Sequence, residues 1–468
     1  MDRKWTLALS GLQYERLQAH LHPGDGLEAA AILLCRVVTG DRSRLLVYDY
    51  ILAPFTSSAR ERDHIIWPGK VLSGAIDRAE DEGASLVLIH SHPGSMLAFS
   101  SIDDVSDRDI IPHIFAGWSE QSPARFHGSA IMTPDGAIRA RLYDVEHNEK
   151  MVDLVTVVGD DIKYFWVEDI EGSNPPAVVQ PFCDGMTDQL GRLSVGIVGA
   201  SGTGSITAEQ AARMGFGEIN LFDFDLVEHK NLNRILNSSI ADAQESRLKV
   251  NMLKAAIESY RDNCTVNAYP LNISEREAVL AASKCDVLFG CVDSLEGRYM
   301  LDLLAQAMLL PLFDVGVTIP TRVSTDGRVV ISDAFGRIDY IQPGRSTLFT
   351  REVYNSESLR AEYLAAADPD AFRDEAAEGY IKGIAQEAPS VIALNMQAAS
   401  ASMLEYIARA FPFRHESNAN YARTIFSIAS AEHDHFAENS FSTEEHPLFA
   451  TGLREPLLGI PSLSESNL

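Results

Sequence analysis

A glycine-rich segment near the middle of the chain constrains the fold more than any other feature. Val195–Val198 is a short apolar run with strand character, Gly199–Ser205 follows it, and Ile206–Met214 has helical spacing of apolar residues. A second apolar run, Ile219–Phe224, ends in acidic residues. Glycines at a strand-to-helix turn let the backbone approach a phosphate at the helix N-terminus. Because the alternation continues through Val287–Gly290, we expect an α/β fold with a doubly wound parallel sheet.

The first 150 residues show a separate alternation of strands and helices. The expected strands are Ala30–Val38, Arg44–Leu52, Ser85–His90 and Ser129–Met132, and the expected helices are Leu12–His20 and Val71–Glu82. A chain of 468 residues exceeds what one hydrophobic core usually holds, so we expect several domains. The expected boundaries are 1–150 for an α/β domain, 151–187 for a closing hairpin and linker, 188–412 for the doubly wound domain, and 413–468 for a partly ordered tail. The expected smaller features are a hairpin of Val155–Val158 with Tyr164–Val167, a linker at Ser173–Pro176, and a long apolar helix at Ala388–Phe411.

The composition excludes several classes of protein. The formal net charge of −27 argues against a broad contact with nucleic-acid phosphates. No apolar run approaches the ~20 residues that span a bilayer. The five cysteines show no C-x-x-C spacing, so they form neither a disulfide framework nor a cysteine zinc ribbon. We therefore expect a cytoplasmic protein that binds neither nucleic acid nor membrane.

His90, His92 and Asp103 form a candidate metal site. The two histidines close an apolar strand, and strand alternation puts both side chains on one face. Asp103 lies beyond the following loop and supplies a third ligand. Three protein ligands with an open position are the arrangement of a catalytic Zn²⁺. Such an ion makes hydroxide available near neutral pH.

Glu28 and Ser100 are candidate partners of this site. A carboxylate must take and return the proton of the attacking water, and Glu28 lies just ahead of the strand Ala30–Val38. Asp25 is near enough in sequence to compete for that role. Ser100 is placed to hydrogen-bond a developing oxyanion.

The full spacing resembles the JAMM (MPN/JAB) metalloprotease family. It consists of H-x-H, a gap of seven residues, S-x-x-D and an upstream glutamate, and the resemblance covers about residues 1–145. Members cleave peptide or isopeptide bonds after the C-terminus of ubiquitin-like proteins. The resemblance implies that His90, His92 and Asp103 bind Zn²⁺, that Glu28 is the general base and that Ser100 assists the oxyanion.

Charged residues downstream of the glycine-rich segment distinguish it from a plain dinucleotide-binding turn. Asp223 and Asp225 stand at the end of the second strand, where a carboxylate suits ribose hydroxyls. Arg234 and Lys249 suit a triphosphate, and Asp293, after a later strand, suits Mg²⁺. A hydride-transfer enzyme has no evident use for that set.

This arrangement resembles the ThiF family of adenylyltransferases over about residues 188–412. The family includes ubiquitin-activating enzymes and the activators of sulfur-carrier proteins. The resemblance implies a Rossmann-like domain, often homodimeric, that uses MgATP to form an acyl adenylate on the C-terminal carboxylate of a ubiquitin-like protein. The implied nucleotide-binding residues are Gly199, Gly202, Gly204, Asp223, Asp225, Asn231, Arg234, Lys249 and Asp293, with Arg234 also acting in catalysis, Asp293 holding Mg²⁺ and Lys254 a lesser alternative to Lys249. The resemblance also includes Ala388–Val391 and Asn395, at the helix that ends such domains.

The cysteines depart from those of thioester-forming relatives. Cys291 is the last cysteine of the chain, and Cys285 and Cys291 lie in or beside a buried-looking strand, where a thiol acts as a small hydrophobe. Three routes remain open for the acyl group: direct transfer to a partner's cysteine, which we favour, transfer to a hydroxyl, or transfer to another thiol. The hydroxyl candidates are Ser346, Thr347 and Thr350, and the thiol candidates are Cys183 and Cys264.

Together the two resemblances indicate a bifunctional enzyme. It is similar to the fused proteins of bacterial ubiquitin-like conjugation operons, some of which are linked to phage defence. The expected partners are a ubiquitin-like modifier, a conjugating enzyme and a second copy of the chain. Two alternatives stay open: activation of a sulfur carrier with a carrier-trimming peptidase, and a non-catalytic binding scaffold.

Overall fold

The computed structural model describes residues 4–118, 125–167, 184–377 and 390–465. The chain divides into two compact units. The first is built mainly from residues 1–178, with the short segments 307–309 and 448–453, and the second from the remainder. Each unit is described by itself.

The first unit is built around a nine-stranded mixed sheet of order β11-β10-β1-β3-β2-β6-β7-β8-β9. Its strands are β1 (Trp5–Ser10), β2 (Ala30–Val38), β3 (Ser43–Leu52), β6 (Ser85–Ser91), β7 (His127–Met132), β8 (Ile138–Tyr143), β9 (Glu149–Met151), β10 (Leu154–Val158) and β11 (Ile162–Trp166). A small separate hairpin consists of β4 (Ala59–Arg60) and β5 (Ile65–Ile66). The helices are α1 (Gly11–Leu21), α2 (Gly69–Glu82) and α3 (Ser101–Ala116). The expected strands and helices of this region are thereby confirmed, within one or two residues at most ends.

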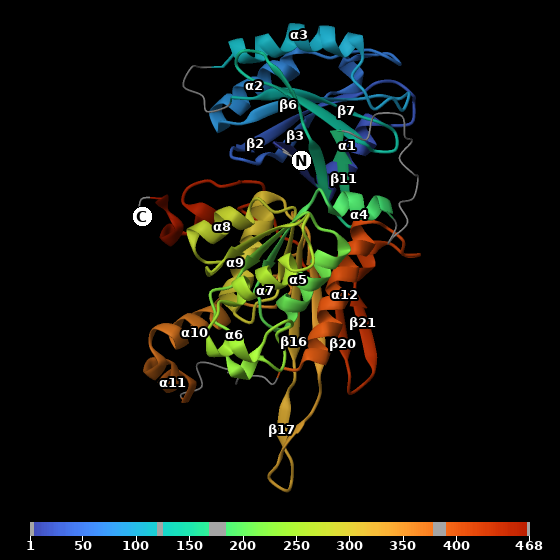
Figure 1. The fold of residues 1–468 in the computed structure, drawn as a ribbon. Helices are drawn as coiled ribbons and strands as arrows, with labels where there is room; N and C mark the ends of the chain where they lie inside the picture. Colours follow the sequence, from blue (N-terminus) through green and yellow to red (C-terminus); the bar gives the residue numbers. More distant parts are fainter. Residues whose placement is uncertain (1–3, 119–124, 168–183, 378–389, 466–468) are drawn as a thin grey trace. The chain divides into compact units, whose positions relative to one another are not determined.

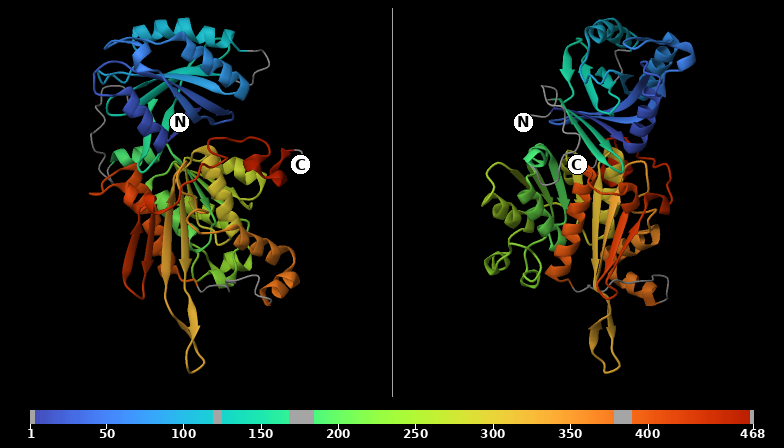
Figure 2. Two further views of the ribbon diagram at one scale, coloured as in Figure 1. Left: turned by 180° about the vertical axis from the view of Figure 1, so that it is seen from behind. Right: turned by 90° about the vertical axis from the view of Figure 1, so that its right-hand side faces the viewer.

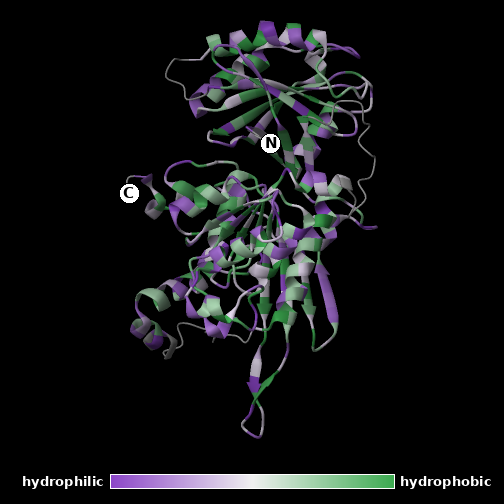
Figure 3. Cartoon of the chain, in the orientation of Figure 1, coloured by the Kyte–Doolittle hydropathy of each residue, from purple (hydrophilic) through white to green (hydrophobic). Residues whose placement is uncertain are grey.

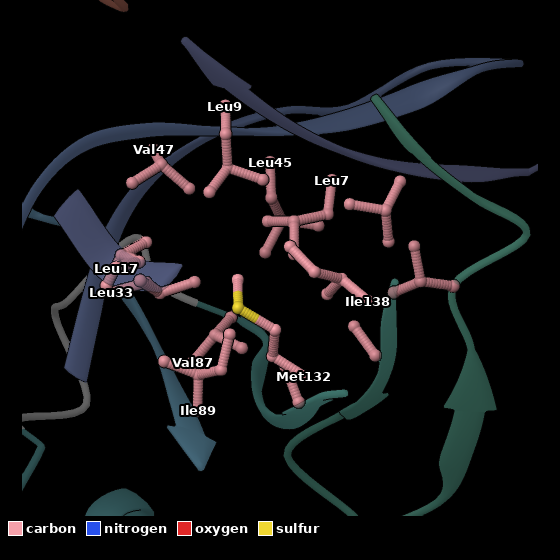
Figure 4. Close-up of a cluster of buried hydrophobic side chains, with 14 of the residues drawn as sticks. Leu7, Leu9, Leu17, Leu33, Leu45, Val47, Val87, Ile89, Met132 and Ile138 are labelled. Atoms are coloured by element: carbon pink, nitrogen blue, oxygen red, sulfur yellow. The ribbon is translucent and has the colours of Figure 1, made fainter. Parts of the chain in front are cut away.

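Each face of this sheet carries its own hydrophobic core. The alternation along β6 shows the division, because Val87 and Ile89 join the cluster covered by α1, whereas Leu86 and Leu88 join the cluster covered by α2 and α3. Figure 4 shows the first cluster, with Leu17 of α1 packed among strand residues. His90 follows the same alternation. It therefore lies on the face that also carries α3.

The second unit has an eight-stranded sheet of order β14-β13-β12-β15-β16-β19-β20-β21. Its strands are β12 (Ser194–Val198), β13 (Glu218–Phe222), β14 (Thr265–Tyr269), β15 (Val287–Gly290), β16 (Leu312–Thr318), β19 (Phe335–Ile341), β20 (Arg423–Ser427) and β21 (Glu432–Phe436). The first five pair in parallel and the last three are antiparallel. Its helices are α4 (Asp184–Leu190), α5 (Gly202–Met214), α6 (Ile240–Gln244), α7 (Lys249–Glu258), α8 (Arg276–Ala282), α9 (Leu295–Met308), α10 (Ser356–Ala367), α11 (Pro369–Ala377) and α12 (Ile392–Ala410).

The parallel part of the sheet confirms the expected doubly wound fold. The chain runs from β12 outward to β13 and β14, then crosses back to β15 and β16 on the other side of β12. The strand order thus reverses between β12 and β15, and doubly wound sheets bind ligands at the carboxyl ends of the strands at such a reversal. The glycine-rich turn follows β12 and Asp293 follows β15, so the strand order brings both to this edge.

The C-terminal region corrects one expectation. Residues 413–468 were expected to be a partly ordered tail, but β20 pairs with β19 and β21 pairs with β20, so both strands extend the large sheet. Figure 2 shows this hairpin continuing the sheet beside α12. The sequence does not predict β21, because this strand lies at the edge of the sheet and all five of its residues are exposed. Hydrophilic colouring dominates β21 in Figure 3, so no apolar alternation marks it.

A narrow hairpin, β17 (Thr321–Val323) with β18 (Val329–Ile331), extends beyond the ends of β16 and β19 (Figure 1). The expected hairpin of the first unit is also present as β10 and β11, and β10 pairs in parallel with β1. The expected linker at Ser173–Pro176 lies outside the described residues, as do Ala388 and Pro389 of the expected long helix. In the described part of the chain, no helix is both long enough and apolar enough to cross a membrane.

Candidate functional sites

His90 and His92 bring their ring nitrogens together at the end of β6. The two Nε2 atoms lie 3.1 Å apart. The Asp103 carboxylate meets both, with Oδ1 3.0 Å from His90 Nε2 and Oδ2 3.3 Å from His92 Nε2. On His92, Nδ1 lies 2.9 Å from the Met96 carbonyl oxygen. That contact fixes the proton on Nδ1 and leaves Nε2 as the ligating atom.

Asp103 is oriented by the first turn of α3. Ser100 is the N-cap of this helix, and its Oγ accepts a hydrogen bond from the Asp103 N–H at 3.2 Å. In return, Asp103 Oδ2 accepts from the Ser100 N–H at 2.6 Å. This capping box ties the carboxylate to the helix end. The bond that Ser100 Oγ accepts does not use its hydroxyl hydrogen, which is free to be donated elsewhere.

The donor set fits a zinc ion. Two ligands about 2.0–2.1 Å from a tetrahedral Zn²⁺ lie about 3.4 Å apart, close to the observed separation of the two Nε2 atoms. Burial alone would raise the pKa of Asp103, but the neighbouring His90 and His92 side chains hold it below its usual range. Asp103 is therefore a carboxylate at any ordinary pH, as a metal ligand must be.

Glu28 lies beside this cluster and Asp25 does not. One carboxylate oxygen of Glu28 groups with ring nitrogens of His90 and His92, all within 4.8 Å of one another. Burial raises the pKa of Glu28, although the two histidines oppose the shift. The Asp25 carboxylate instead pairs with Arg60 at 2.8 Å. The structure therefore separates the two candidates that the sequence left in competition.

A pocket adjoins the cluster on the α3 side. Its lining includes Glu28, His90 and Asp103 together with apolar side chains from β5 and α3. The other main lining residues are His64, Ile65, Trp67, Ile102, Ser106 and Ile110. The pocket therefore combines polar side chains of the candidate metal site with an apolar wall.

The glycine-rich turn of the second unit depends on its glycines. Gly199 has φ +90°, and a Cβ there would lie 2.5 Å from the Cys291 carbonyl oxygen. A Cβ on Gly204 would lie 1.7 Å from the Gly199 carbonyl oxygen. Gly202 begins α5 and faces Asn395 of α12. These close approaches bring β12, the turn and α5 together as a phosphate-binding turn requires.

Asp223 connects this turn to the end of β13. Its carboxylate accepts hydrogen bonds from the Ala200 N–H at 2.7 Å and from the Asp225 N–H at 2.8 Å. Burial raises the pKa of Asp223, and Lys249 opposes the shift. The Lys249 ammonium is buried, 2.6 Å from the Asp225 carboxylate and 3.8 Å from that of Asp223. Lys254 instead donates to the Val266 carbonyl oxygen, so of the two lysines only Lys249 lies at these carboxylates.

Asn231 and Arg234 stand on the turn after β13. Asn231 is buried, and its side-chain oxygen accepts from the Glu228 N–H at 3.0 Å, which closes the turn. The Arg234 guanidinium donates to the Lys230 carbonyl oxygen at 3.0 Å and to Asn233 Oδ1 at 3.2 Å. Asn231 thus has a structural role here, and Arg234 lies against its own turn.

Asp293 is exposed at the end of β15. Arg298 donates to its carbonyl oxygen at 3.2 Å and also lies 3.3 Å from Asp314. Arg337 pairs with the other side of Asp314. Asp314 and Arg337 are not among the residues predicted from the sequence, although a charged residue inside an apolar strand such as β16 was an available signal.

The burial of Ser346 and Thr347 disfavours both residues as acyl acceptors. Ser346 is fully buried, and its hydroxyl donates to Glu438 at 2.6 Å while accepting from Arg351 at 2.8 Å. Thr347 is also buried and bonds within its own turn to Thr350. An acyl acceptor must be accessible to the adenylate, and these two hydroxyls are buried.

Two of the cysteines are small buried groups, as expected. Cys285 and Cys291 are buried, and burial raises the pKa of Cys291 to about 12. Cys264 is half-buried, and burial raises its pKa as well. Cys183 lies outside the described residues. A raised pKa, as in Cys264 and Cys291, is the opposite of the lowered pKa that activates a thiol nucleophile.

Models of two protein families match the two units of the chain. The ThiF family model matches residues 175–435, which is more than half of the chain. The chain belongs to the ThiF family. A model for prokaryotic homologs of the JAB domain matches residues 13–140 of this ThiF protein, so it carries a JAB domain ahead of its ThiF domain.

Curated relatives match this ThiF protein over part of their length. Ubiquitin-like modifier-activating enzyme 5 of Bombyx mori is 29% identical over 173 residues, which cover 35% of this chain and 40% of the relative. The enzyme of the same name from Culex quinquefasciatus is 26% identical over 196 residues, covering 38% and 46%. The chain thus spans less than half the length of these relatives.

Solved structures give a weaker likeness. The crystal structure of E. coli MccB with ATP aligns with a TM-score of 0.41 and 16% identity, over 57% of this chain and 68% of that chain. Selenomethionine PaaA aligns with a TM-score of 0.39 and 15% identity, over 54% and 75%.

Proposed function

We propose that this chain is a bifunctional enzyme of ubiquitin-like protein conjugation. Its ThiF domain would adenylate the C-terminal carboxylate of a ubiquitin-like protein, and its JAB domain would cleave peptide or isopeptide bonds that follow such a tail. The convergence of His90, His92, Asp103 and Glu28 beside a pocket, on the same chain as a ThiF domain, carries the proposal. The name of the curated relatives favours a ubiquitin-like protein over a sulfur carrier as the substrate.

In the peptidase half, His90, His92 and Asp103 would hold the zinc ion. Zinc supplies a hydroxide nucleophile near neutral pH and polarises a carbonyl group. Glu28 takes the proton from the attacking water and returns it to the leaving amine. Burial raises the pKa of this carboxyl, and that direction favours the return of the proton. The Ser100 hydroxyl donates to the carbonyl oxygen as negative charge develops there.

In the adenylation half, a carboxylate oxygen of the tail attacks the α-phosphorus of ATP. The bond between the α-phosphorus and the bridging oxygen breaks, and pyrophosphate leaves with that oxygen. The glycine-rich turn receives the phosphates at the N-terminus of α5, and Asp223 binds the ribose hydroxyls. Lys249 and Arg234 stabilise charge on the phosphoryl oxygens, and Asp293 would hold Mg²⁺.

Direct transfer of the acyl group to a conjugating enzyme's cysteine is the route we propose. Its support is that Cys285, Cys291 and Ser346 are buried, whereas an acyl acceptor has to be accessible. We also propose a homodimer, by analogy with the family.

Paired variants test the two activities separately. Hydrolysis of a fluorogenic peptide amide ending in Gly-Gly reports the peptidase, and ATP–pyrophosphate exchange with a panel of ubiquitin-like proteins ending in Gly-Gly reports adenylation. We expect His90→Ala to abolish hydrolysis and preserve exchange, and Asp293→Ala to do the reverse. A wild-type protein that shows neither activity would refute the proposal, and loss of both activities in either variant would refute separable sites.

A further inference from the structure

Arg60 of β4 reaches the backbone of the segment that carries Glu28. Its Nε donates to the Glu28 carbonyl oxygen at 2.7 Å, and one terminal nitrogen donates to the Leu27 carbonyl oxygen at 3.2 Å. The other terminal nitrogen of the guanidinium pairs with the Asp25 carboxylate at 2.8 Å. The guanidinium carbon also lies 4.2 Å from the centre of the Phe55 ring. One half-buried side chain thus contacts three residues of this segment, Asp25, Leu27 and Glu28.

The other side of the Glu28 peptide is held by the same hairpin. The Glu28 N–H donates to the Glu61 carbonyl oxygen at 2.7 Å, and the Glu61 N–H donates to the His64 carbonyl oxygen at 2.8 Å. Both polar groups of the Glu28 backbone are therefore bonded to residues 60–61. At the next residue, the Ala29 carbonyl oxygen accepts from the Ser91 N–H of β6 at 2.9 Å, and the Ala29 N–H donates to the Ser91 hydroxyl at 2.8 Å.

Glu28 has no regular secondary structure to hold it. It lies between α1 and β2, after Gly24 and Gly26, whose φ values are +93° and +71°. Such a segment has many alternative conformations when its carbonyl groups are released. The placement of the Glu28 carboxylate beside His90 and His92 depends on these backbone bonds.

We propose that Arg60 is a positioning residue for the peptidase reaction. Its fork holds the Leu27 and Glu28 carbonyl groups so that the Glu28 carboxylate stays beside the two histidines. Lysine cannot replace it fully, because an ammonium is a single point charge without a planar fork. The inference rests on the proposed peptidase function, but the backbone contacts that carry it are independent of that function.

The test compares Arg60→Met, Arg60→Lys and a matched control, Arg62→Met, in the full chain. Arg62 lies two residues further along the same hairpin and its side chain is exposed. Hydrogen exchange of the peptide covering Leu27–Ala29, measured without metal, reports the backbone. Zinc content and steady-state hydrolysis of the Gly-Gly peptide amide report the site.

We expect faster exchange at Glu28 in Arg60→Met, and a fall in kcat of about ten- to a hundredfold with little change in KM, because a small displacement of a reacting group has effects of that size. Zinc content should stay at the wild-type level, since Arg60 contacts none of the three ligands in the described structure. Arg60→Lys should retain part of the wild-type kcat, and Arg62→Met should retain all of it.

The failures are distinguishable. An Arg60→Met protein that matches Arg62→Met in exchange and in kcat would overturn the inference alone. A fall in kcat explained by lost zinc would also overturn it. Absence of hydrolysis in the wild-type protein would refute the peptidase function, and the role of Arg60 in catalysis with it.

Discussion

Ser100 and Asp103 hold each other through two reciprocal hydrogen bonds, of 3.2 Å to the serine oxygen and 2.6 Å to the carboxylate. The helix cap and the third candidate ligand are therefore one structural unit. A change to the helix cap therefore changes the orientation of the Asp103 carboxylate.

This pairing predicts the effect of Ser100→Ala. The variant loses the acceptor for the Asp103 N–H, so the first turn of α3 frays and the carboxylate loses its orientation. We expect zinc affinity to fall about ten- to a hundredfold, as for other losses of ligand-orienting bonds. Chelator competition measures it, and Ser101→Ala, at an exposed neighbouring position, is the control. Equal affinities in the two variants would contradict the coupling.

Lys249→Met is expected to weaken ATP binding by about tenfold or more. The ammonium offsets the carboxylates of Asp223 and Asp225, and without it their charge repels a polyphosphate. Calorimetric titration with ATP measures the change. Lys254→Met is the matched control, because that amine bonds to a carbonyl of β14. An equal loss in both variants would return the choice between the two lysines to an open question.

The burial of Cys285 and Cys291 predicts that their thiols are alkylated slowly. Burial raises the pKa of Cys291 to about 12, so almost no thiolate is present at pH 8. We expect iodoacetamide to leave Cys285 and Cys291 unmodified in the native chain and to modify both after unfolding, as peptide mass spectrometry would show. Adenylation should survive Cys291→Ala. Rapid native labelling of Cys291 would instead make it a candidate acceptor.

Ser346→Ala is expected to affect stability and not acyl transfer. Its hydroxyl bonds both Arg351 and Glu438 in a buried charged network, and loss of such a partner costs about 1–3 kcal/mol. Thermal unfolding measures the cost, and pyrophosphate exchange measures the activity. Normal stability with lost transfer to a partner would restore Ser346 as an acceptor.

Buried His127 predicts how the first unit responds to acid. Burial lowers its pKa to about 3, and the neutral ring accepts a hydrogen bond from the Leu86 N–H at 3.1 Å. Because the folded-state pKa lies below the unfolded value of about 6.5, the unfolded chain binds the extra proton. The contribution of the neutral His127 ring to the free energy of unfolding is complete above pH 6.5. It is lost as pH falls toward 3, by up to about 1.4 kcal/mol per pH unit.

Tryptophan fluorescence can follow this effect, because all four tryptophans lie within the first 166 residues. We expect His127→Asn, whose side-chain oxygen can accept the same bond, to flatten the loss of stability between pH 6.5 and 4. An unchanged pH dependence would show that other groups determine the acid response.

The parts that sequence predicted are those with strong local patterns. Strand alternation placed His90 and His92 on one face, and the glycine-rich turn between β12 and α5 fixed the type of the second sheet. Both depend on residues close together in the chain, whose geometry follows from the period of the element.

The parts that sequence missed depend on distant contacts. Nothing near Arg60 in the chain indicates that it bonds Glu28, and nothing near Ser346 indicates that Glu438 covers it. Asn231 matched a nucleotide-binding motif, but the motif did not indicate that its side-chain oxygen also closes a turn. Strand β21 has no apolar face to reveal it. Pairings between residues far apart are decided by the tertiary fold, which local spacing does not encode.

The parallel pairing of β10 with β1 has a consequence for synthesis of the chain. Strand β1 emerges from the ribosome before its neighbour β10, which begins only at Leu154, so this part of the first sheet cannot form until that later segment emerges. A fragment ending at residue 150 would expose the edge of β1 and is expected to aggregate, whereas one ending at residue 167 retains β10 and β11. The late strand thereby sets the shortest piece of this polypeptide from which the histidine cluster could be studied alone.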